Sequence, residues 1–118
     1  MALSDYQEKV DEWTSQFEKP YWEPHEILAR ITEETGELAR LINHIYGPKK
    51  KKVNEDKQEL AEELCDIIFA IVCMANSHNI NLDRAFERVM DKAYGRDNDR
   101  FKKNISRKVI SRRQSTKP

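Results

Sequence analysis

The chain has 118 residues, enough for one domain, and its hydrophobic fraction of 38% is nearly matched by a charged fraction of 36%. No apolar run approaches the roughly 20 residues that cross a membrane, and the amino-terminal stretch lacks signal-peptide features, so we expect a cytoplasmic protein with no membrane partner. Residues 1–101 hold 21 acidic and 14 basic side chains, whereas 102–118 hold seven basic ones and no acidic one. An acidic body is a poor nucleic-acid surface, so no specific nucleic-acid partner is expected.

The first predicted helix covers 4–18. Ser4 followed by Gln7 resembles a capping box at its start. Large apolar residues then recur at helical spacing, namely Tyr6, Val10, Trp13 and Phe17. Pro20 ends this element, and Pro24 opens a second helix predicted over 24–46, which Gly47 and Pro48 stop.

A third helix is predicted over 55–78, after a basic loop that includes Lys49 and Lys50. Its second half, 67–75, is apolar on every side, which is typical of a helix surrounded by others. A fourth begins with Asn81 as its N-cap, turns Leu82, Phe86, Val89 and Ala93 inward, and ends near Gly95. We expect Cys65, Cys73 and Trp13 to be core residues, both thiols being reduced.

Scarce glycine and proline predict an all-α fold, and the thin apolar supply predicts self-association. The expected core is a four-helix up-down bundle that is completed by oligomerisation, as a homodimer or homotetramer. Residues 1–104 would form the functional domain. Residues 105–118 would form a flexible basic tail, because they contain few residues to bury.

Acidic residues interrupt the apolar stripes of the second and third helices. At 100° per residue, Glu34 falls inside the stripe of the second helix and Glu37 on its edge, while Glu33 points outward. The third helix repeats the arrangement with Glu63 and Asp66, spaced i, i+3 so that both carboxylates share a face. Helices joined by a short loop pack antiparallel, which would bring the two pairs together.

Converging carboxylates in apolar surroundings repel one another and are costly to desolvate unless a cation compensates them. An all-oxygen ligand set favours magnesium, with manganese as a substitute. Iron is not expected, because no histidine stands at the Glu-x-x-His spacing of di-iron bundles. The alternative is that these acids are solvated helix faces or form ordinary salt bridges.

Two segments resemble the E-E-x-x-E … E-x-x-D signature of the MazG-like all-α nucleotide pyrophosphohydrolases. They are Glu33-Glu34-Thr35-Gly36-Glu37 and Glu63-Leu64-Cys65-Asp66, and the resemblance extends over roughly residues 20–100. It implies that Glu34, Glu37, Glu63 and Asp66 hold Mg²⁺. Water would attack the α-phosphorus of a (d)NTP to give a (d)NMP and pyrophosphate, with Glu33, Glu34 and Glu37 as catalytic residues and Glu33 orienting or deprotonating the water. Clearing non-standard nucleotides is one role that such an activity would serve.

Candidate substrate contacts are one aromatic residue, to stack a base, and five cations, to hold phosphates: Trp22, Lys49, Lys50, Lys92, Arg96 and Arg100. Relatives often carry Lys-x-x-x-Asn-x-x-Arg after the fourth helix, and this chain departs from that arrangement. Two other functions stay open: a phosphoribosyl-ATP pyrophosphohydrolase-like enzyme, and a non-catalytic helical module for nucleotide binding or dimerisation.

Overall fold

The computed structural model of the protein describes residues 1–48 and 53–104, with the side chains of 53–56 outside this description. It contains α1 (Leu3–Thr14), α2 (Pro24–Tyr46), α3 (Val53–Ser77) and α4 (Leu82–Gly95), and no strand occurs within these described ranges. The predicted all-α class is confirmed. The chain divides into two compact parts, Met1–Phe86 and Glu87–Pro118. The predictions for the lysine loop and for the tail at 105–118 fall outside the described residues.

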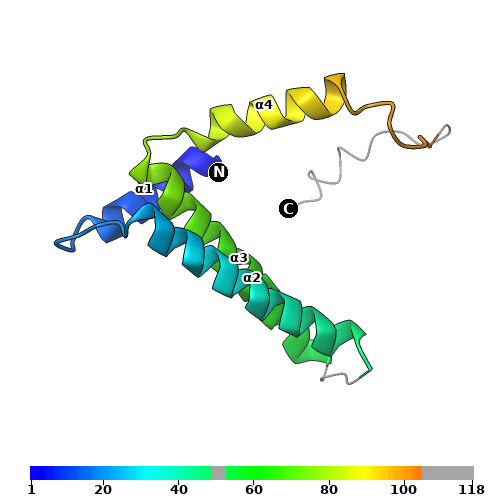
Figure 1. The fold of residues 1–118 in the computed structure, drawn as a ribbon, viewed down its shortest axis with the longest axis horizontal. Helices are drawn as coiled ribbons and strands as arrows, with labels where there is room; N and C mark the ends of the chain where they lie inside the picture. The colour runs from blue at the N-terminus through cyan, green and yellow to red at the C-terminus, as the bar shows by residue number, and fades with distance from the viewer. Residues whose placement is uncertain (49–52, 105–118) are drawn as a thin grey trace. The chain divides into compact units, whose positions relative to one another are not determined.

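Helices α2 and α3 form an antiparallel pair and lie side by side along their length (Figure 1). The core of the pair consists of small and medium aliphatic side chains, namely Ile27, Leu41, Ala70, Val72 and Ala75. Burying an aliphatic side chain of this kind stabilises the fold by roughly 1.5–3 kcal/mol for the larger members. This packing sets the register of the two helices and hence which of their acidic residues meet.

Helix α1 differs from the prediction at both ends. It starts at Leu3, where the backbone N–H of Ala2 donates to the Asp5 carboxylate at 2.9 Å, so the expected capping box of Ser4 and Gln7 is wrong. It ends at Thr14 rather than near 18. The hydroxyls of Thr14 and Ser15 bond to backbone carbonyls three residues earlier, at 3.3 and 3.0 Å, and such bonds compete with helix continuation.

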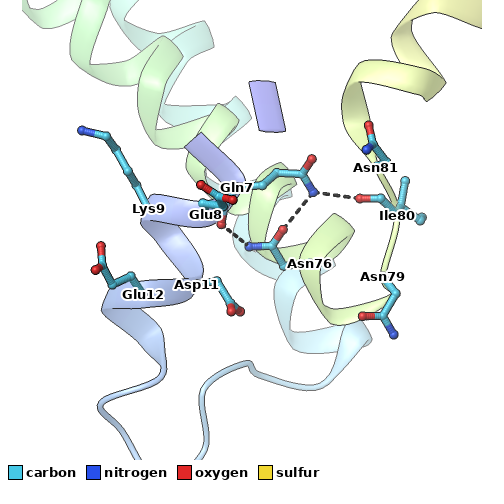
Figure 2. Close-up of a pocket in the computed structure, with 9 residues that line it drawn as sticks. All are labelled: Gln7, Glu8, Lys9, Asp11, Glu12, Asn76, Asn79, Ile80 and Asn81. Carbon is cyan, nitrogen blue, oxygen red and sulfur yellow. Dashed lines mark hydrogen bonds between the residues drawn. The ribbon is translucent and has the colours of Figure 1, made fainter. Parts of the chain in front are cut away.

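The side chain of Gln7 instead bonds to residues far along the chain (Figure 2). Its Nε2 donates to Asn76 Oδ1 at 2.9 Å and to the carbonyl of Ile80 at 2.8 Å, while its Oε1 accepts the N–H of Leu82 at 3.0 Å. Asn76 Nδ2 donates in return to the Gln7 carbonyl at 3.0 Å and to the Tyr21 hydroxyl at 2.9 Å. These bonds join α1 to the carboxyl end of α3 and to the turn that follows it.

Helix α4 begins as predicted. The Arg84 N–H donates to Asn81 Oδ1 at 3.0 Å, which confirms Asn81 as the N-cap. Its predicted inward face is not buried, however, since Phe86 and Val89 are about half exposed. An amphipathic stripe shows which face of a helix is apolar, but its burial depends on a partner that packs against that face. No described helix is both long enough and apolar enough to span a membrane.

Two residues predicted in the core lie at the surface. Trp13 is 54% exposed, with its ring edge-on to Phe17 at 5.0 Å and to Phe69 at 6.2 Å between centroids. Cys65 is exposed, whereas Cys73 is half-buried, and both are free thiols, as expected. Cys65 stays accessible because α2 covers only one side of α3, whereas Trp13 of α1 lines a cavity instead of filling a core.

Candidate functional site

The antiparallel packing of α2 and α3 brings three of the predicted acids together. Glu34 and Glu37 come from successive turns of α2, and Glu63 faces them from α3. One carboxylate oxygen from each lies within 4.8 Å of the others. Glu34 is only 3% exposed, Glu63 is half-buried and Glu37 is exposed, so the cluster reaches from the helix interface to the surface. We refer to these three residues as the carboxylate cluster.

Two oxygens in this cluster are buried without a hydrogen-bond partner in the described structure: Oε1 of Glu34 and Oε1 of Glu63. Partial burial, together with the nearby charges of Glu37, Asp66 and Glu34, raises the pKa of Glu63. Unsatisfied carboxylate oxygens and mutual repulsion are the two costs that a divalent cation removes. Because every donor is an oxygen, the cluster fits a hard cation such as Mg²⁺ or Mn²⁺.

Asp66, the fourth predicted ligand, stands one turn after Glu63 on α3 but is not one of the three mutually close residues. It is exposed, and with Glu34 it lines a cavity of about 530 Å³. Its charge also contributes to the raised pKa of Glu63. Asp66 is therefore close enough to influence the cluster, and its role as a ligand stays a prediction.

The cavity that Glu34 and Asp66 line is formed by α1, the segment after it, α2 and α3. Its walls are rich in aromatic side chains, namely Trp13, Phe17, Tyr21, Trp22 and Phe69. Flat rings around an opening of this size can accommodate a planar heterocycle. From the sequence, Trp22 was the one aromatic residue predicted to stack a base. The contribution of α1 went unrecognised because its aromatic residues match an ordinary core stripe.

A second cavity, of about 670 Å³, lies beside α1 and the turn after α3 (Figure 2). Most of its lining residues are polar, and Gln7 and Asn76 are bonded to each other there. These groups already satisfy one another and hold α1 in place. The aromatic cavity beside the carboxylate cluster is therefore the stronger candidate for a binding site.

Arg30 is a site residue that the sequence analysis missed. Its Nη2 lies 2.9 Å from Glu34 Oε2 and its Nη1 lies 3.9 Å from Glu33 Oε1. It also lines the aromatic cavity, together with Trp22. The i, i+4 spacing of Arg30 and Glu34 was the available signal. Glu33 itself points outward as predicted, with a side chain that is 68% exposed.

The other predicted phosphate contacts are not assembled into a described site. Lys49 and Lys50 lie outside the described residues. Lys92, Arg96 and Arg100 are exposed and belong to the Glu87–Pro118 part. The last two both approach Asp97, with Arg96 Nε at 3.6 Å and Arg100 Nη1 at 3.3 Å from its Oδ1. Their contact with substrate stays a prediction.

Residues 22–101 match the MazG nucleotide pyrophosphohydrolase domain, which covers most of the chain and both acidic segments. The protein is thus an all-α enzyme of the MazG nucleotide pyrophosphohydrolase family, and the resemblance inferred from the acidic motifs is confirmed. The amino-terminal 21 residues, including α1, lie outside the matched range although α1 lines the aromatic cavity.

The chain is also similar to individual proteins over most of its length. YpjD of Bacillus subtilis is 47% identical to this chain over 100 residues, which cover 85% of this chain and 90% of YpjD. YvdC of the same organism is 31% identical over 102 residues, which cover 78% of this chain and 92% of YvdC. The crystal structure of YpjD has a TM-score of 0.72 over 78% of this chain and 94% of its own. The Bacillus-conserved MazG protein, a nucleotide pyrophosphohydrolase, is 42% identical in sequence, and its crystal structure has a TM-score of 0.68. The match covers 78% of this chain and 88% of that protein.

Proposed function

We propose that the protein is a magnesium-dependent nucleoside triphosphate pyrophosphohydrolase that converts a (d)NTP to a (d)NMP and pyrophosphate. The observation that carries this proposal is the carboxylate cluster, with two buried oxygens left unpartnered, next to an aromatic cavity. The cluster could bind a divalent cation and the cavity could bind a nucleobase. A nucleoside triphosphate with its bound cation contains both groups.

In the proposed site, Glu34, Glu37 and Glu63 hold the cation, and Asp66 stands one turn after Glu63 on α3. When bound, Mg²⁺ would neutralise phosphate charge and lower the pKa of a coordinated water. The water oxygen forms a bond to the α-phosphorus while the bond from that phosphorus to the α–β bridging oxygen breaks, so pyrophosphate leaves. Glu33 is the proposed acceptor of the water proton, because it is an unburied carboxylate at the edge of the site, beside Arg30.

Trp22 is the proposed base-stacking residue. Its indole is 55% exposed and lines the aromatic cavity and, with Arg30 and Glu33, a smaller adjacent hollow. Stacking on an aromatic ring gives affinity without strong choice among bases. The proposed substrate class is therefore nucleoside triphosphates as a group, including non-standard ones.

The direct test is pyrophosphate release from a panel of standard and damaged (d)NTPs, with Mg²⁺ and after chelation. We expect release that requires the cation and that Glu37→Gln and Asp66→Asn abolish while the helical circular dichroism stays unchanged. Unchanged turnover in both variants would remove the cluster from the reaction. Phosphoribosyl-ATP belongs in the panel, since a marked preference for it would replace this proposal by its related alternative. Nucleotide binding without any turnover would identify a non-catalytic module.

A further inference from the structure

Glu34 is an unusual residue of the cluster because its two carboxylate oxygens have different surroundings. Oε2 is paired with Arg30 Nη2 at 2.9 Å, whereas Oε1 is buried and has no hydrogen-bond partner in the described structure. A carboxylate on a flexible side chain can rotate about its last bond. An ion pair on one oxygen restricts that rotation and fixes where the other oxygen lies.

Arg30 is well placed to act in this way. It stands one helical turn before Glu34 on α2, so its backbone is rigidly related to that of its partner. The Arg30 side chain is about half exposed, while the Glu34 side chain is 4% exposed, so the pair lies at the rim of a buried carboxylate. A charge-assisted bond in partly buried surroundings is stronger than an ordinary surface pair.

We propose that Arg30 is a positioning residue for the metal ligand Glu34: it engages Oε2 and thereby keeps Oε1 available for the cation. This rests on the proposed function only in treating the carboxylate cluster as the metal site. Partners that orient metal ligands in this way typically change metal affinity by about 10- to 100-fold when they are removed.

A simpler role predicts the opposite sign. If Arg30 only neutralised the acidic cluster, removing its positive charge would make the cluster more negative and cation binding tighter. If Arg30 positions Glu34, removing it frees the carboxylate to rotate and makes cation binding weaker. The direction of the change in affinity therefore separates the two roles.

The experiment is calorimetric titration of the full chain with Mn²⁺ alone, for the unaltered protein and for Arg30→Ala, Arg30→Lys and Arg40→Ala. We expect Arg30→Ala to weaken Mn²⁺ binding by about 10-fold, and Arg30→Lys, which keeps a charged donor at the same spacing, to recover much of it. Arg40→Ala removes the same charge from the same helix, outside the contacts described for the cluster, and should leave binding unchanged or slightly tighter.

Activity gives an independent readout. Pyrophosphate release by Arg30→Ala should be reduced at low Mg²⁺ and approach that of the unaltered protein as Mg²⁺ saturates. If the loss instead persists at saturating Mg²⁺ with an unchanged Mn²⁺ affinity, Arg30 contacts the substrate and the positioning role is wrong. Tighter Mn²⁺ binding by Arg30→Ala overturns the proposal in favour of charge neutralisation.

The two proposals fail in different ways. If the unaltered protein binds Mn²⁺ but releases no pyrophosphate from any nucleotide, the proposed function is wrong while the effect of Arg30 on affinity is still measured. If it binds no Mn²⁺, the metal site and the role of Arg30 are both wrong. Should Arg30→Ala fail to fold by circular dichroism, Arg30→Lys and Arg30→Gln give the comparison, with weaker binding expected for the uncharged glutamine.

Discussion

At the scale of single residues, Glu33 and Glu34 are adjacent in sequence yet occupy opposite environments. The helix turns by 100° between them, which leaves the Glu33 side chain 68% exposed and buries Glu34 to 3% exposure. Burial leaves Glu34 with one unpartnered oxygen and a close ion pair to Arg30, whereas the exposed Glu33 lies 3.9 Å from the same guanidinium. One step along the backbone therefore separates a candidate ligand from a candidate base.

Glu63→Gln should stabilise the metal-free protein while removing its response to Mg²⁺ and its activity. The raised pKa of Glu63 shows that its ionised form is disfavoured by burial and by its acidic neighbours, so the neutral amide should raise the Tm of the metal-free protein at pH 7. The same change should remove the increase in Tm caused by Mg²⁺ and abolish turnover. Calorimetric melting with and without Mg²⁺ checks this. The matched control is Glu62→Gln at an exposed neighbouring position, and a Mg²⁺-dependent increase retained by Glu63→Gln would contradict the assignment.

Trp22→Ala tests the base contact. Loss of one stacking surface is worth about 1–3 kcal/mol, so we expect KM to rise by roughly 10-fold while Mn²⁺ affinity stays unchanged. Steady-state kinetics and calorimetry measure the two quantities. Tyr6→Ala removes a similarly exposed aromatic ring from α1 outside the cavity and should leave KM unchanged. An unaltered KM in Trp22→Ala would exclude stacking at this residue.

At the scale of elements, α1 is attached to the rest of Met1–Phe86 through polar side chains as well as through the ring contact of Trp13 with Phe69. Asp83 accepts the backbone N–H groups of Leu3 at 3.0 Å and of Ser4 at 3.4 Å, so a carboxylate from the first turn of α4 caps α1. Gln7 and Asn76 add the bonds described above. Because α1 also lines the aromatic cavity, these polar contacts help to maintain the shape of the candidate binding site.

Asp83 should make the attachment of α1 dependent on pH. Hydrogen bonds from the Ser4 hydroxyl and from the backbone of Ser4 and Leu3 lower the pKa of Asp83. A lowered pKa in the folded state means that the ionised form stabilises the fold above the unfolded value of about 3.9, and that this contribution disappears as the pH falls through the folded value. Asp83→Asn should therefore lower Tm at pH 7, and its difference from the unaltered protein should shrink below about pH 4.

Melting curves between pH 7 and pH 3 measure this effect, with Asp91→Asn on the same helix as the control for a lost negative charge. A difference in Tm between Asp83→Asn and the unaltered protein that stays constant down to pH 3 would show that the charge of Asp83 does not stabilise α1.

At the scale of the whole molecule, apolar side chains remain exposed along one face of α3. Leu64, Ile68 and Ile71 are 42–50% exposed, and their i, i+4, i+7 spacing places them in one line. Exposed rows of this kind are characteristic of surfaces that another chain covers. Self-association, which the thin apolar supply predicts, stays a prediction. The exposed row on α3 is the surface through which we expect it to occur.

Light scattering should give at least twice the chain mass of 14.0 kDa at micromolar concentration. Ile68→Glu places a charge in the middle of the apolar row and should shift the protein towards the monomer. Ile80→Glu makes the same change at an equally exposed isoleucine outside the row and should leave the mass unchanged. A monomeric mass for the unaltered protein would contradict this prediction.

The sequence by itself determined α2 and α3 and the acidic motifs that they carry. The bounds of α2 matched the prediction and those of α3 differed by two residues or fewer, because proline, glycine and the apolar stripe are local signals. The grouping of Glu34, Glu37 and Glu63 could be predicted because these acids interrupt the apolar stripes of two consecutive helices. When the two stripes pack against each other, the acids within them come close together.

Only the tertiary structure decided which side chains bond across the fold. Gln7 bonds to Asn76, 69 residues away, and Trp13 lines a cavity rather than a core. Arg30 lies 3.9 Å from Glu33 and 2.9 Å from Glu34, and spacing alone could not show that its closer partner is the buried carboxylate. A periodic pattern gives the direction of a side chain around its own helix, whereas its partners and burial depend on how the helices pack together.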